Sequence, residues 1–205
     1  MHINWLGQTC VKLQTKNLDE EVVIIIDAYR PQQGDFPRNL APQIALFSHG
    51  DEEAVTMGQN TLAINTLGEL EIKGVMIYSI PGPNGQLIFK LNAEGMNIVH
   101  LGKLTKKLSN GDLEKISGPD ILFLPVGGHD EYLDAEEAAG LVTTLEPRIV
   151  IPMGFQCDSD PKVGALSEFI KEMGLKPEIT DKKLILKKKD LPQEETKLFV
   201  LEKNY

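Results

Sequence analysis

Short apolar segments rich in Val and Ile recur along the first hundred residues, and this pattern most restricts the fold. Each segment is bounded by Gly, Pro, Asn or Asp, as is typical of strands that end in turns. The strands expected from this pattern are residues 3–6, 10–15, 22–26, 43–47, 61–65, 69–73, 75–80, 86–91 and 97–101.

The second half of the chain alternates strands with helices. Expected helices are 109–117, 134–145, with Asp134 as its cap, and 161–173; expected strands are 121–126, 148–153, 183–187 and 197–202. A strand-rich half followed by alternating strands and helices predicts helices packed outside sheets, in an α/β or α+β sandwich. The basic run 187–189 is expected to be a solvated turn, and the strand edge at 197–201 either pairs with a second copy or is covered within the monomer.

Length and charge narrow the class of protein. A chain of 205 residues fits a single domain, 1–205, which we expect to contain two similar halves, about 1–95 and 96–205. The net charge of −9 argues against a general nucleic-acid surface. We find no signal peptide and no apolar run long enough to cross a membrane. Cys10 and Cys157 are too far apart for a CxxC motif, so we expect free thiols and a cytoplasmic protein.

Residues 46–54 combine a strand end with polar side chains suited to chemistry. One imidazole, His49, and three carboxylates, those of Asp51, Glu52 and Glu53, follow the expected strand at once. Taken alone, this stretch favours a structural interpretation, in which Ser48 or Asp51 caps a helix and the glutamates lie in its first turn.

The order of motifs along the chain resembles the metallo-β-lactamase superfamily, and more specifically its bacterial branch of small Zn-dependent hydrolases that includes ascorbate-phosphate-lactonase-like proteins. The matching segments run from the first residues to about position 155. They are 3–10 (INWLGQTC), 24–27 (IIID) with the loop after it, 46–49 (LFSH), 66–69 (TLGE) with 73–75, 100–102 (HLG), 124–128 (LPVGG) and 149–153 (IVIPM).

The resemblance implies an αββα sandwich, in which two sheets face each other and helices lie outside. It also implies an active site on loops along one edge, where one or two zinc ions activate water for hydrolysis. The family's ligands come from a THxHxDH motif, a later lone His, an Asp after HLG and a final His after a strand.

This chain departs from that ligand pattern at most positions. On the THxHxDH motif only the first His remains, as His49, while Asp51, Glu53 and Ala54 replace the later ligands. No histidine lies near 79–85, Lys103 replaces the bridging Asp, and Gly154 replaces the final His. The resemblance therefore implies a former active-site edge at His49, Asp51, Glu53, Lys103, His129 and Gly154, with no dinuclear zinc centre of the family's kind.

Two interpretations of this edge stay open. His49, Asp51 and Glu53 could hold one Zn²⁺, Mn²⁺ or Mg²⁺ if Asp27 or His129 supplied a fourth ligand, although we favour no metal at all. Alternatively, the Lys103 ammonium could pair with Asp51 or Glu53 and replace the missing cation. His100 is expected to be a hydrogen-bonded structural histidine, and His129 to lie near a ligand or to be an exposed loop residue.

Two functions follow. The first is a hydrolase-like protein that has lost zinc catalysis and binds an unknown small molecule or protein. The second is a mononuclear metal-dependent hydrolase of a small phosphorylated or lactone-like substrate. The sequence gives no prediction of oligomeric state.

Overall fold

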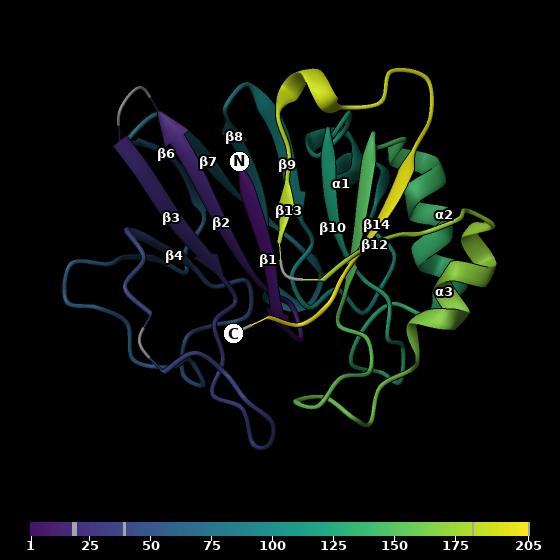
Figure 1. Cartoon of the computed structure of the whole chain (residues 1–205), viewed down its shortest axis with the longest axis horizontal. Helices are drawn as coiled ribbons and strands as arrows, with labels where there is room; N and C mark the ends of the chain where they lie inside the picture. Colours follow the sequence, from purple (N-terminus) through teal and green to yellow (C-terminus); the bar gives the residue numbers. More distant parts are fainter. Residues whose placement is uncertain (18–19, 39, 182, 205) are drawn as a thin grey trace.

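The protein is built from two β-sheets that pack face to face, with helices on one side (Figure 1). The structure, a computed structural model, describes residues 1–17, 20–38, 40–181 and 183–204. The first sheet has the strand order β13 (Leu184–Ile185), β1 (His2–Gly7), β2 (Cys10–Asn17), β3 (Glu20–Ile26), β4 (Ile44–Leu46) and β5 (Leu62–Ile64). Within it, β3, β4 and β5 are parallel and the other pairs are antiparallel.

The second sheet contains eight strands and spans the rest of the chain. Its order is β12 (Glu178–Thr180), β14 (Lys197–Leu201), β11 (Ile149–Met153), β10 (Ile121–Pro125), β9 (Met96–His100), β8 (Leu87–Ala93), β7 (Val75–Pro81) and β6 (Gly68–Ile72). The strands β9, β10, β11, β14 and β12 are parallel to one another, whereas the pairs from β9 through β8 and β7 to β6 are antiparallel. Their nearly continuous apolar sequences suit a sheet that is covered on both faces.

The main core lies between the two sheets and under the helices. The helices are α1 (Asn110–Lys115), α2 (Ala135–Leu145) and α3 (Leu166–Met173), with short 3₁₀ turns at Pro83–Gly85 and Lys188–Asp190. Figure 1 shows α2 and α3 side by side outside the second sheet. The outer face of the first sheet is covered by the loops after β3 and β4. Phe36 and Leu40 from the first loop, and Val55 and Met57 from the second, pack on a second apolar cluster there.

The expected αββα fold class is confirmed, with these two loops in place of a helix over the first sheet within the described ranges. Asp134 caps α2 as expected, and Ser109, expected as the first residue of a helix, is the N-cap of α1. Three details were wrong. The helix expected from 161 begins at Leu166, because Gly164 donates its N–H to Gly127 O at 2.6 Å and holds the preceding segment as a loop. The strand β12 was not expected. The helix after residue 48 does not form.

The absent helix has a clear cause. Ser48 caps nothing, because its N–H and hydroxyl both donate to Asp27 and its carbonyl accepts from Leu87 N. Gly50, at φ +89°, then turns the chain away from a helical path.

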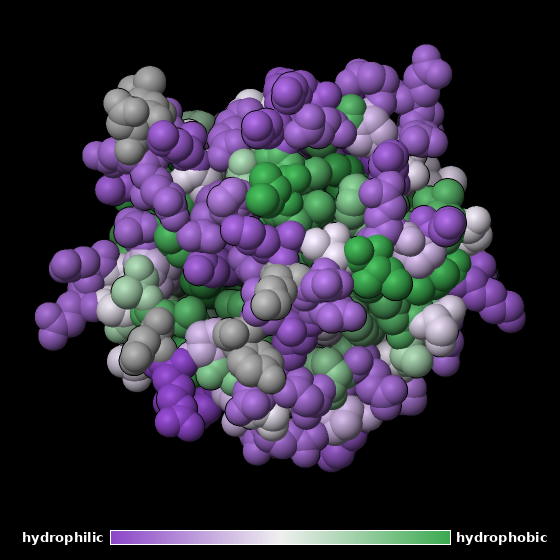
Figure 2. Space-filling view, in the orientation of Figure 1, coloured by the Kyte–Doolittle hydropathy of each residue, from purple (hydrophilic) through white to green (hydrophobic). Residues whose placement is uncertain are grey.

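The strand at 197–201, whose edge the sequence left either open or covered, is not an edge strand. Strand β14 lies between β11 and β12, so the edge at 197–201 is covered within the monomer. The edge strands β12 and β13 carry Ile179 and Ile185, which are 66% and 51% exposed. Figure 2 shows two apolar areas on this face, over β13 and near β12. No helix in the described part of the chain is long and apolar enough to cross a membrane.

An ionic contact joins the start of β1 in the first sheet to the turn between β8 and β9 in the second. The Met1 α-ammonium donates to Glu94 Oε2 at 2.7 Å, and Thr15 Oγ and Lys16 N donate to Glu94 Oε1. Burial opposes the charged form, but these donors outweigh it and hold the pKa of Glu94 below its usual value.

We expect Glu94→Gln to lower the free energy of unfolding by about 2 kcal/mol at neutral pH, as is usual for charged hydrogen bonds. Because the folded pKa is lowered, this contribution is present above the ordinary pKa of a glutamate and is lost as pH falls through the folded value. Urea unfolding of both proteins between pH 7 and 3 checks this. A difference that stays constant with pH would contradict it.

Candidate functional site

Loops from both sheets meet at one edge of the molecule, the lower edge in Figure 1, and enclose a groove. Because β3 and β4 are parallel, and β9, β10 and β11 are parallel, the residues that follow each set of strands emerge together. The groove has an outer hollow of about 600 Å³ and an inner hollow of about 360 Å³. Both hollows are lined by Gln8, Tyr29, Glu53, Lys103 and Tyr132.

A buried carboxylate, Asp27, holds the strand end that leads to His49 in the inner hollow. Asp27 directly follows β3, has φ +53° and is 2% exposed. It accepts hydrogen bonds from Ser48 N at 2.6 Å and from Ser48 Oγ at 2.8 Å. These bonds fix the end of β4 against the end of β3 and so determine where His49 begins.

His49 is held with one ring nitrogen free. The Ser48 hydroxyl has one proton, which it gives to Asp27, so the 3.0 Å contact between Ser48 Oγ and His49 Nδ1 has Nδ1–H as donor. His49 Nδ1 also lies 3.8 Å from Asp27 Oδ1. The imidazole lines the inner hollow and is 42% exposed. Among the residues that the structure describes, its Nε2 has no hydrogen-bond partner.

His100 is structural, as expected. It is fully buried, its Nε2–H donates to Thr9 O at 2.9 Å, and its Nδ1 accepts from Gly102 N at 3.1 Å. Burial lowers the pKa of His100, although the nearby Asp27 charge and the hydrogen bond to Thr9 oppose that effect. Both ring nitrogens of a neutral imidazole are thereby satisfied.

The candidate metal ligands of the 49–54 stretch are not brought together. Glu53 lines both hollows, but Asp51 is exposed, lines neither, and accepts a hydrogen bond from Asn65 at 3.4 Å. Among the residues that the structure describes, no group of three His, Cys, Asp or Glu side chains is arranged to hold a metal ion. His129 is exposed and lines only the outer hollow.

Lys103 does not pair with Asp51 or Glu53, so that hypothesis was wrong. Its ammonium lies 2.5 Å from Glu131 Oε2, in the loop after β10. Its positive charge also favours the ionised form of the nearby Asp160 carboxyl. Burial and the Glu131 charge raise the pKa of Asp160, against the opposing effects of Lys103 and a hydrogen bond from Tyr132.

We expect Lys103→Ala to lower the free energy of unfolding by less than about 1 kcal/mol, because exposed ion pairs contribute little. Lys103 and Glu131 are 38% and 54% exposed. Lys115→Ala, which breaks the comparable pair with Asp112, is a matched control. Chemical denaturation measures both, and a loss more than twice that of the control would show that Lys103 acts as a buried counter-charge.

An aromatic ring lies against the position where the resemblance places the final histidine. Gly154 has φ +62°, and a Cβ built on it would lie 3.0–3.1 Å from three ring carbons of Tyr132. The Tyr132 hydroxyl donates to Asp160 Oδ2 at 2.9 Å, so the ring is anchored at its far end. Burial and the neighbouring Asp160 raise the pKa of Tyr132, which keeps it a phenol.

Several groove residues could not be found from the sequence. Tyr29 donates to Leu6 O at 3.0 Å and contacts Ser159 Oγ at 2.7 Å, which joins the loop after β3 to the loop after β11. Ser159 and Asp160 lie in a loop without a motif. A weak signal exists for Tyr29, which lies in the loop that follows the 24–27 motif, and for Tyr132, which follows the 124–128 motif. Two of the residues that line the groove, Gln8 and His129, have positive φ.

Two facing sheets with a groove formed by loops at one edge define the metallo-β-lactamase class of fold. A family model described as "Beta-lactamase superfamily domain" matches residues 2–154, and the chain belongs to this superfamily of metal-dependent hydrolases. The match ends at Gly154, so Ser159 and Asp160 lie beyond it.

Individual relatives agree with this assignment. The chain is 26% identical over 193 residues to a UPF0173 metal-dependent hydrolase of Thermococcus onnurineus, which covers 84% of this chain and 83% of the relative. It is 30% identical over 129 residues to a UPF0173 metal-dependent hydrolase of Pyrococcus abyssi, and this match covers 57% of this chain and 55% of the relative. A crystal structure of a metallo-β-lactamase superfamily protein from Thermotoga maritima superimposes with a TM-score of 0.82, at 24% identity, covering 98% of this chain and 99% of that one.

Proposed function

We propose that this protein uses the groove to bind a small polar ligand and does not hydrolyse it through a dinuclear zinc centre. The observation that carries the proposal is the Tyr132 ring packed against Gly154, with its hydroxyl tied to Asp160. A side chain that could supply a zinc ligand from position 154 would meet this ring. Lys103 and Asp51 support the same conclusion. Lys103 is a cation, and Asp51 accepts a hydrogen bond from Asn65.

The donor set does not fit the family's metal centre. Zinc is held by imidazole, thiolate and carboxylate groups that converge on one point. Here a lone imidazole, that of His49, lines the inner hollow together with two glutamates, and an ammonium shares the same space. We therefore derive no catalytic step through a metal ion.

The charges of the groove indicate the class of ligand. The outer hollow is lined by three cations, Arg30, Lys103 and Lys162, and by three acids, Glu53, Glu131 and Asp160. Amide and hydroxyl groups of Gln8, Gln32, Gln33 and Ser159 lie between them. Because the charges balance, this lining favours a neutral or mixed-charge polar molecule over a polyanion.

A titration of ¹⁵N-labelled protein, followed by NMR, tests ligand binding. Three probes are compared: a neutral monosaccharide, a γ-lactone and a phosphomonoester. We expect at least one probe to shift the amide signals around Lys103 and Tyr132. Lys103→Ala should lower the affinity for that probe about tenfold, as for the loss of a charged hydrogen bond. Lys115→Ala should bind as the wild type does. No shift at the groove with any probe would count against the proposal.

A second candidate, the mononuclear metal-dependent hydrolase, is favoured by one observation. His49 has Nε2 unbonded in the inner hollow, beside Glu52 and Glu53. Turnover of the lactone or phosphomonoester that requires added Zn²⁺ or Mn²⁺ and is lost in His49→Ala would select this function over ligand binding alone.

A further inference from the structure

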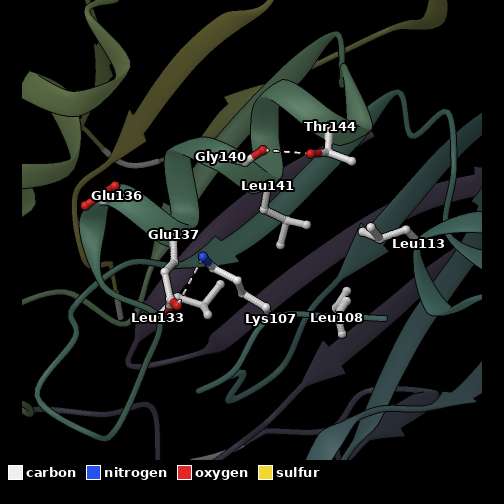
Figure 3. A pocket seen from close by; sticks show the side chains of 9 residues that line it. All are labelled: Lys107, Leu108, Leu113, Leu133, Glu136, Glu137, Gly140, Leu141 and Thr144. Atoms are coloured by element: carbon white, nitrogen blue, oxygen red, sulfur yellow. Dashed lines mark hydrogen bonds and ion pairs between the residues drawn. The ribbon is translucent and has the colours of Figure 1, made fainter. Parts of the chain in front are cut away.

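A second hollow, of about 380 Å³, lies between α2 and the segment 107–113 and shares no lining residue with the groove. Its apolar lining consists of four leucines (Figure 3): Leu108, Leu113, Leu133 and Leu141. Lys107 Nζ and Glu137 Oε1, 3.7 Å apart, flank the leucines on one side. The hollow is therefore an apolar depression with a charged rim.

A glycine in the middle of α2 opens this hollow further. Gly140 lines it, and a Cβ built at Gly140 would meet no atom within 4 Å. Its φ is not positive, so the backbone does not require glycine there. Glycine inside a helix costs about 1 kcal/mol relative to alanine. Since no contact within the described part of the chain explains this cost, the missing side chain suits the close approach of another molecule.

The surface around the hollow is strongly acidic. Helix α2 carries Glu136 and Glu137 and no basic residue. The shallow hollow at its start adds Asp134, Glu168 and Glu172, with Lys171 as its one cation in the described lining. Glu114 and Glu146 lie in another hollow at its far end. A partner that fits this surface must carry positive charge around an apolar centre.

We propose that the hollow beside Gly140 is a docking site for a basic amphipathic helix of a partner protein. Leucine-like side chains of that helix enter the hollow between Leu113 and Leu141. Its lysine or arginine side chains face Glu136 and the acids at both ends of α2. An apolar anchor surrounded by complementary charge is the usual arrangement for a helix bound in a groove.

A labelled model peptide tests the site directly. The probe is a fluorescein-labelled peptide of Leu and Lys, about 18 residues long, with leucines at i, i+3, i+4 and i+7 so that they share one helix face. Fluorescence anisotropy measures its affinity for the full chain. We expect Gly140→Met, which fills the hollow, to weaken binding about tenfold, the effect of roughly 1.4 kcal/mol.

Two controls make the result specific. Thr143→Met adds the same side chain at an exposed position of α2 outside the hollow and should leave the affinity unchanged. Methionine favours helix more than glycine does, so loss of binding by Gly140→Met cannot be ascribed to a weakened α2. A peptide of the same composition with its leucines dispersed around the helix should bind at least about tenfold more weakly.

Three outcomes would overturn the proposal. Equal affinity for the dispersed peptide would mean that attraction to the acidic surface alone accounts for binding. Equal binding by Gly140→Met and wild type would place the peptide elsewhere. The absence of binding to the wild-type chain would show that the hollow does not accept a helix of this kind.

Discussion

Replacing Gly154 with histidine is expected to lower the free energy of unfolding by about 3 kcal/mol, the sum of backbone strain and overpacking. The φ of +62° disfavours any side chain with a Cβ, and the new Cβ would meet the Tyr132 ring at 3.0–3.1 Å. The ring cannot easily move, because Tyr132 is 5% exposed and its hydroxyl is bonded to Asp160. Urea unfolding at neutral pH measures the change.

Gly118→His separates the two causes. Gly118 has the same φ of +62°, but a Cβ there meets nothing within 4 Å, so only the backbone cost of about 1 kcal/mol should appear. Adding Tyr132→Ala to Gly154→His should recover part of the loss caused by that histidine. If Gly154→His costs no more than Gly118→His, the Tyr132 ring does not block this position, and the main support for a lost metal centre fails.

Asp27→Ala is expected to cost about 3 kcal/mol, because it leaves two buried donors of Ser48 unpaired and forces an alanine into positive φ. Asp27 accepts Ser48 N and Ser48 Oγ and is almost completely buried. Asp27→Asn should cost less, since asparagine tolerates this backbone conformation and keeps one acceptor oxygen.

Asp35→Ala is a control in the same loop. Asp35 is exposed, and a substitution there should change stability by less than about 0.5 kcal/mol. Thermal and chemical unfolding report all three variants. If Asp27→Ala lowers the free energy of unfolding no more than Asp35→Ala does, the Asp27–Ser48 contact does not hold the ends of β3 and β4 together.

Most of the fold could be predicted because each strand carries its own local signal. The apolar run 22–26 and the alternation in 10–15 appear as β3 and β2, and Asp134 marks the start of α2. The exceptions depend on contacts distant in sequence. Ser48 looks like a helix cap until Asp27 takes both of its donors. Strand β12 is three residues long and exposed at Ile179, so it lacks the usual pattern.

The candidate site was predicted only at positions that a motif marks. The sequence indicates where ligands are missing, at Lys103 and Gly154, but not what lies beside those positions. Glu131 and Tyr132 reach them from the loop that follows the 124–128 motif, where the motif does not specify these two residues, and Asp160 lies in a loop more than fifty residues beyond Lys103. Parallel strand order brings these loops together, and that order cannot be read from local sequence. The proposed division into similar halves stays a prediction.

Metal content tests the central claim most directly. The purified protein is dialysed against excess Zn²⁺ or Mn²⁺, freed of unbound ion, and measured by elemental mass spectrometry beside His49→Ala. We expect a ratio near zero for both proteins. A ratio near one metal per chain that is lost in His49→Ala would contradict it and would establish the groove as a mononuclear metal site.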